Sequence, residues 1–191
     1  MEIQQAIEIR RSIRAYGDRP VEREKLEAVL RAGNQAPIFG RLHMSVFAGP
    51  EQLQAVDAAA VAGMARSGVP FLENLAAQEG YHPLYGAAAL VVLSAPGGLD
   101  EKGFNMANVS CAAENMLLAA AGLGLGSCFL MGPMAAFSDP ALRARLELPG
   151  GYEPRGRGGP GLRRSGAPRR PGSGRMPVSP GADKQSGGRP L

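Results

Sequence analysis

One uninterrupted apolar run limits the possible folds of this chain more than any other feature. Residues 87–93 read Ala-Ala-Ala-Leu-Val-Val-Leu, without the alternation of polar and apolar residues that is typical of a half-exposed strand. Such a run predicts a central strand that is covered on both faces. A chain of 191 residues is long enough to supply that cover from its own helices.

A long helical pattern follows, from Asn105 to Ala121. Its inner stripe recurs at helical spacing and consists of Val109, Ala112, Ala113, Met116, Leu117 and Ala120. The other faces are also largely apolar, with Cys111, Leu118, Ala119 and Ala121. We therefore expect a helix that is buried nearly all round, either within the core or at a subunit interface.

The remainder of residues 1–154 alternates helical and strand patterns. Two helices are predicted from apolar stripes, one with Ile3, Ala6, Ile7 and Ile13 and one with Leu26, Val29, Leu30 and Gly33. A third helix is predicted to begin at Pro50 and to bury Leu53, Val56, Ala60 and Met64. A fourth is predicted to begin at Asp139-Pro140 and to bury Leu142 and Leu146. Strands are predicted around residues 44–48 and 126–131. Residues 67–86 are expected to be irregular.

The composition changes abruptly after Pro154. Residues 155–191 contain ten Gly, six Pro and eight Arg, and they carry a net charge of +8, whereas residues 1–154 carry −4. This composition predicts a low-complexity, disordered basic tail without a sheet strand, beside a single domain over residues 1–154. A reading-frame shift near codon 155 is one hypothesis for its origin, and it requires an apolar strand to be encoded in another frame.

The chain has few candidates for side-chain catalysis. His43 and His82 lie in different segments, and a structural or solvated role is expected for each. The sequence has no Ser/His/Asp arrangement, phosphate loop or metal-ligand spacing, so no metal is predicted and a cofactor would have to supply the chemistry. Cys111 and Cys128 lie in apolar runs, and no run is long enough to span a membrane, which favours a cytoplasmic protein without a membrane partner.

Residues 10–16, RRSIRAY, gather three guanidinium groups and a hydroxyl within five residues. On a continuing helix, Arg10 and Arg14 would share one face, with Arg11 and Ser12 at its edge. Paired, charge-assisted hydrogen bonds from arginine suit a phosphate. A solvated basic last turn that offsets the helix dipole is the alternative.

Four segments, in this order, resemble the nitroreductase-type family of flavin-dependent oxidoreductases. They are RRSIRAY with the following RPVEREKLEAVLRAGNQAP, then LYGAAALVVLSAP, NMANVSCAAENMLLAAAGLGLGSCFLMG and LRARLELPGGYEP. The resemblance implies an α+β fold with a mixed sheet, helices on both faces, and a long buried central helix at a homodimer interface. It also implies FMN at that interface, contacted by both chains.

The resemblance further implies the residues of the site. Arg10, Arg11, Ser12 and Arg14 match the group that holds the FMN phosphate and ribityl chain, and Pro37 matches a turn beside the isoalloxazine ring. Phe129, Leu130, Met131 and Gly132 match a strand end stacked on the flavin, where a backbone N–H of Met131 or Gly132 would point toward flavin N5. Two departures stand out: residues 38–43 lack the Asn and Gln of many relatives, and the strand that usually follows the GYEP-like turn is expected to be missing.

The implied activity is hydride transfer from NADH or NADPH through flavin N5 to an electron-poor acceptor, such as a nitroaromatic or a quinone. The flavin would carry the chemistry, and no catalytic side chain is predicted. One alternative is a flavin-binding protein whose turnover is impaired by the missing strand. Another is an RNA-associating protein that uses the basic tail, although no aromatic residue occurs there to stack a base, so nucleic acid is not the expected partner.

Overall fold

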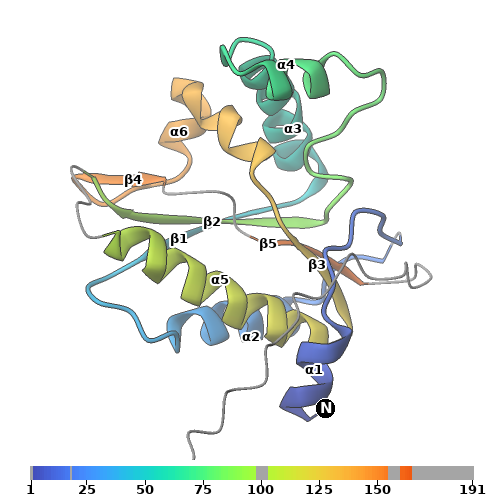
Figure 1. Ribbon diagram of the computed structural model, residues 1–191, viewed down its shortest axis with the longest axis vertical. Coiled ribbons are helices and arrows are strands. Elements are labelled where there is room, and N and C mark those ends of the chain that lie inside the picture. Colours follow the sequence, from blue (N-terminus) through green and yellow to red (C-terminus); the bar gives the residue numbers. More distant parts are fainter. Residues whose placement is uncertain (1, 18, 98–102, 155–159, 165–191) are drawn as a thin grey trace, which may run out of the picture.

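The computed structural model in Figure 1 describes residues 2–17, 19–97 and 103–154, and the backbone of residues 160–164. Its central element is β2 (Ala89–Pro96), in which every residue except the last is buried. The sheet has five strands: β1 (His43–Ala48), β2, β5 (Pro160–Arg164) and β3 (Leu125–Phe129) lie in that order, and β4 (Tyr152–Pro154) also pairs with β2. The sequence-based prediction of a doubly covered central strand is confirmed.

Two helical layers bury the two faces of β2, as Figure 1 shows. Leu90 and Val92 pack into a core with α3 (Pro50–Met64), the short 3₁₀ helix η1 (Gly132–Ser138) and α6 (Pro140–Ala144). Ala89, Val91 and Leu93 pack on the other side with α2 (Arg23–Asn34) and α5 (Phe104–Gly122). Successive side chains of a strand point to opposite faces, so a continuous apolar run serves both layers.

The helices with a strong apolar stripe lie where the sequence predicted them. In α3, Leu53, Val56, Ala60 and Met64 are all buried, and Asp139 caps α6 by accepting hydrogen bonds from the N–H groups of Ala141 and Leu142. The expectation of an irregular stretch over residues 67–86 is wrong in part, because α4 occupies Pro70–Ala76. This seven-residue helix buries none of its residues and therefore leaves no periodic signal.

The long helix α5 is not buried all round within a single chain. Its predicted inner stripe is buried, together with Asn108 and Ala121. Phe104 and Met106 are 47% and 40% exposed, and Ser110 and Glu114 on later turns are also exposed. One face of α5 is therefore left uncovered by the parts of the chain that the structure describes.

The expectation that no sheet strand follows Pro154 is wrong. The backbone of Pro160–Arg164 forms β5 between β2 and β3, with Leu162 opposite Ala89 on one side and opposite Ser127 on the other. Proline stands at the first position of this strand, where it disturbs the hydrogen-bond ladder least. The pairing also satisfies backbone groups of two buried strands, a gain that composition does not register. Residues 155–159 and 165–191, where the basic tail was predicted, lie outside the described residues.

All the pairings between named strands are antiparallel among the residues that the structure describes. The parallel component of the expected mixed sheet is an isolated bridge between Ser12 and Ser127, at the outer edge of β3. Because β2 and β3 both run antiparallel to β5, they are parallel to each other without being neighbours.

The contact between α3 and η1 gives a test of this packing. A methyl group added at Gly63 would collide with the backbone carbonyl of Ala135 in η1, whereas one added at Gly122, the last residue of α5, would meet nothing within 4 Å. We expect Gly63→Ala to destabilise the fold by about 1–3 kcal/mol, because a backbone carbonyl cannot move aside as a side chain can. Thermal unfolding followed by circular dichroism should show a melting temperature several degrees lower. Gly122→Ala is the matched control and should melt no lower than the native protein; equal melting of the two variants would contradict this packing.

Candidate functional site

The arginine-rich segment leaves the helix before its first arginine. Helix α1 spans Ile3–Ile9, and Arg10 has φ −55° and ψ 128°, which is extended backbone. The N–H of Ile13 donates to the carbonyl of Ser127 at 2.9 Å, beside the parallel bridge from Ser12 to Ser127. The prediction that Arg10–Arg14 continues the helix is therefore wrong: the segment runs along the outer edge of β3.

Extended backbone distributes these side chains differently from a helix, because alternate residues point to opposite sides. Ser12 makes a side-chain hydrogen bond with the Cys128 thiol of β3, and burial raises the pKa of that thiol, which the positive charges of Arg14 and Arg10 both act to lower. Ile9, Arg11 and Ile13 instead line a cavity of about 140 Å³ beside residues 124–127, to which Arg10 also contributes. The structure thus gives the predicted residues different neighbours: Arg10 and Arg11 border this cavity, whereas Ser12 lies beside Cys128.

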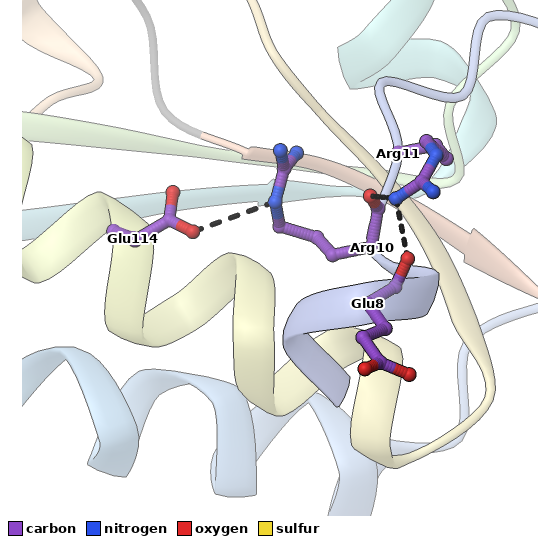
Figure 2. Close-up of polar contacts among 4 residues, drawn as sticks. All are labelled: Glu8, Arg10, Arg11 and Glu114. Atoms are coloured by element: carbon purple, nitrogen blue, oxygen red, sulfur yellow. Dashed lines mark hydrogen bonds and ion pairs between the residues drawn. The ribbon is translucent and has the colours of Figure 1, made fainter. Parts of the chain in front are cut away.

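Figure 2 shows that the side chains of Arg10 and Arg11 point away from each other. Arg11 turns back on its own chain, where its Nη1 donates to the carbonyls of Glu8 and Arg10, each at 2.6 Å. Arg10 extends toward α5, where its Nε lies 3.4 Å from Oε1 of Glu114. Arg11 therefore supports the C-terminal end of α1, whereas Arg10 joins the edge segment to the central helix.

A group of tyrosines lies beside Arg14. The Arg14 guanidinium is 5.9 Å from the centre of the Tyr85 ring, and Tyr85 meets Tyr81 edge-on with 6.2 Å between ring centres. Burial, helped by the neighbouring Tyr85, raises the pKa of Tyr81 to about 12. Burial also raises the pKa of Tyr16 and of Cys128, and in both cases the positive charge of Arg14 opposes the shift.

The end of β3 lies next to these tyrosines. Phe129 is partly buried and Leu130 is buried, whereas the Met131 side chain is 56% exposed at the point where the chain enters η1. A methyl group added at Gly132 would lie 3.4 Å from Cβ of Pro83 and 3.6 Å from the Tyr81 hydroxyl. The structure therefore brings Arg14, the tyrosines and residues 131–132 together along one border of the sheet.

Pro37 is not part of this assembly within one chain. It lies in a loop that two hydrogen bonds join to α5. Asn108 Oδ1 accepts from the N–H of Phe39 at 2.9 Å, and Asn108 Nδ2 donates to the carbonyl of Phe39 at 2.7 Å. The Phe39 ring also packs on Phe104, with centres 5.5 Å apart. Asn108 precedes Glu114 by six residues, which is about 9 Å along a helix axis. Pro37 therefore lies near the N-terminal end of α5, whereas Arg10 meets the middle of the helix and lines the cavity beside Ala121, toward the C-terminal end.

Neither histidine joins the arginine residues. His43 makes a hydrogen bond through Nε2 with the carbonyl of Leu146, at the far edge of the sheet, and His82 pairs through Nδ1 with Asp57 at 2.6 Å. Asp57 also accepts from the N–H of Leu84 at 2.9 Å and so fixes the turn that carries Tyr81 and Tyr85. Sequence patterns gave no sign of this pair, because its members are 25 residues apart.

The described residues hold no cluster of metal-ligating side chains and no helix long and apolar enough to cross a membrane.

The raised pKa of Tyr81 predicts a late ionisation. The tyrosinate absorbance of the native protein minus that of Tyr81→Phe should give a titration with its midpoint at about 12 rather than 10.0. Because the folded pKa is the higher one, the stability from this group is complete below pH 10 and is lost as the pH rises through 12. The same difference measured in denaturant is the control and should return to the ordinary value. A native midpoint near 10 would contradict the burial of this hydroxyl.

Comparison with known proteins agrees with the architecture. The model of the Nitroreductase family matches residues 7–157. A protein of Archaeoglobus fulgidus, provisionally named NADH dehydrogenase/NAD(P)H nitroreductase, is 32% identical over 145 residues, which cover 73% of each chain.

Solved structures show the same fold. A nitroreductase of Bacteroides fragilis with bound FMN superposes with a TM-score of 0.78 at 26% identity, covering 94% of this chain and all of the other. A nitroreductase of Desulfitobacterium hafniense with bound FMN superposes with a TM-score of 0.77 at 21% identity, with the same coverage. The family model spans most of the chain and the fold is shared over nearly its whole length, so this chain belongs to the nitroreductase family.

Proposed function

We propose that this protein is an FMN-dependent oxidoreductase that uses NADH or NADPH to reduce an electron-poor small molecule of the nitroaromatic or quinone type. The observation that carries the proposal is the course of the segment Arg10–Arg14 along the outer edge of β3, in a family whose solved members include proteins with bound FMN. Bound FMN would accept a hydride from the nicotinamide and deliver electrons to the acceptor.

The side chains of the edge segment fit a phosphate monoester. Arg14 and Ser12 are exposed, and Arg10 is half-buried. The guanidinium groups and the hydroxyl can donate hydrogen bonds to the phosphate oxygens and, farther along the segment, to the ribityl chain of FMN. The position of Arg14 over Tyr85 holds one of these cations next to the end of β3, where the flavin ring is proposed to lie.

The end of β3 suits the ring-binding role that we propose for Phe129, Leu130, Met131 and Gly132. Gly132 lies close to Tyr81 and Pro83, so a side chain there would crowd the approach to the strand end. Fixed backbone N–H donors near this point would stabilise negative charge without reorganising during the reaction. In this proposal no side chain serves as the general acid or base, and solvent supplies the protons.

A second copy of the chain is the partner that this proposal requires. Pro37 lies near the N-terminal end of α5 and Arg10 lies farther along the helix, and the same helix has an uncovered face with exposed Phe104 and Met106. Pairing of two α5 helices would cover that face and could bring Pro37 of one copy near the arginine residues of the other. The alternative of a flavin-binding protein with impaired turnover has less support, because β5 is present where a strand was expected to be missing.

An absorbance spectrum of the purified protein tests the proposal. We expect the bands of an oxidised flavin, and we expect NADH or NADPH to bleach them under nitrogen, because hydride transfer removes the oxidised chromophore. Adding a quinone or a nitroaromatic should restore the bands. Protein that takes up no flavin after incubation with FMN would overturn the proposal, and stable yellow protein that neither nicotinamide reduces would favour the impaired alternative.

Arginine substitutions test the division of the edge segment. Arg14→Ala should weaken FMN binding by about 10- to 100-fold, which corresponds to the loss of one charged hydrogen-bonding group. Arg11→Ala should have a smaller effect, because Nη1 of Arg11 already donates to the carbonyls of Glu8 and Arg10. Flavin fluorescence quenching measures both effects, and Arg66→Ala, which removes an exposed cation in the turn after α3, is the control and should leave FMN binding unchanged. Equal losses for Arg11 and Arg14 would contradict the alternation of side chains along the segment.

A further inference from the structure

The ion pair between Arg10 and Glu114 has a geometry that leaves part of the guanidinium available. The contact at 3.4 Å is made through Nε of Arg10. In Figure 2 the two terminal nitrogens of the same group point away from the Glu114 carboxylate. The two side chains are 31% and 54% exposed, so the pair lies at the surface, within reach of a ligand. Arg11 is the contrasting case, because its Nη1 is already engaged by two carbonyls.

Holding an arginine by Nε has a consequence for binding. A free arginine side chain has large rotamer freedom, which it loses when a ligand fixes it. A carboxylate that fixes the inner nitrogen removes part of that freedom in advance and leaves the terminal nitrogens for a second acceptor. Glu114 is well placed for this, since it lies on α5, a 19-residue helix packed against the core.

We propose that Glu114 is a positioning residue for the phosphate of the flavin nucleotide: it holds Arg10 by Nε so that the terminal nitrogens of Arg10 face the phosphate monoester. This inference rests on the proposed function, because it presumes that FMN is the ligand. Glu114 itself does not contact the phosphate. Its negative charge opposes the bound dianion to a small degree, and the experiment must therefore separate positioning from charge.

Two substitutions at residue 114 make that separation. Glu114→Gln removes the charge but keeps an oxygen that can accept from Nε, and Glu114→Ala removes both. Because the two variants have the same charge, a difference between them reports the lost acceptor alone. We expect Glu114→Ala to bind FMN about two- to five-fold more weakly than Glu114→Gln, which is the range expected for the loss of one exposed hydrogen bond. Riboflavin, which has no phosphate, should bind the two variants equally.

A double-substitution cycle distinguishes positioning of Arg10 from a general effect on the fold. In an Arg10→Ala background there is no guanidinium to hold, and the two substitutions at residue 114 should then bind FMN equally. The dissociation constants are measured by flavin fluorescence on the full-length protein, and Glu51→Ala, an exposed carboxylate in the first turn of α3, is the control.

Three results would overturn the inference. The first is equal FMN binding by Glu114→Gln and Glu114→Ala when Arg10 is present. The second is a difference that persists without Arg10, and the third is an equal difference for riboflavin. A native protein that binds riboflavin and FMN alike would show that Arg10 does not recognise the phosphate, and one that binds neither would overturn the proposed function itself.

Discussion

The structure depends on the burial of both faces of β2. Its alternate residues face two separate cores, one with α3, η1 and α6 and the other with α2 and α5. A strand with two apolar faces is stable only between two layers, so this one element requires helices above and below the sheet. It also determines where α5 lies, and α5 carries two of the contacts that organise the candidate site: Asn108 with the Phe39 backbone and Glu114 with Arg10.

Local backbone geometry decides what the arginine segment can recognise. On a helix, four residues advance by about 6 Å, so Arg10 and Arg14 would form one compact cationic cluster. In extended chain the same four residues span about 13 Å. The contacts reflect this separation, because Arg10 meets Glu114 on α5 whereas Arg14 lies over Tyr85. Such spacing suits a ligand with an extended chain better than it suits a free phosphate ion.

The sequence predicted the elements whose signal is local and missed those that depend on distant partners. Strand β2 and helices α3 and α5 have strong apolar patterns and occur as expected. The end of α1 could not be predicted, because the bond from the Ile13 N–H to Ser127 joins residues more than a hundred positions apart. Strand β5 was missed for a similar reason, since its place between β2 and β3 depends on backbone pairing that a Gly- and Pro-rich composition hides.

The candidate site has the same division between local and distant information. The family resemblance placed Arg10, Arg11, Ser12 and Arg14 in one group, but it did not reveal that Arg11 turns back toward Glu8. Nor could it show that a single chain separates Pro37 from the arginine residues along α5. Phe39 is 78% exposed and Phe104 is 47% exposed, although the two rings pack on each other. An aromatic pair on the uncovered side of an otherwise apolar helix is poorly accommodated in water. This uncovered surface is therefore the one on which the proposed second copy would complete the site.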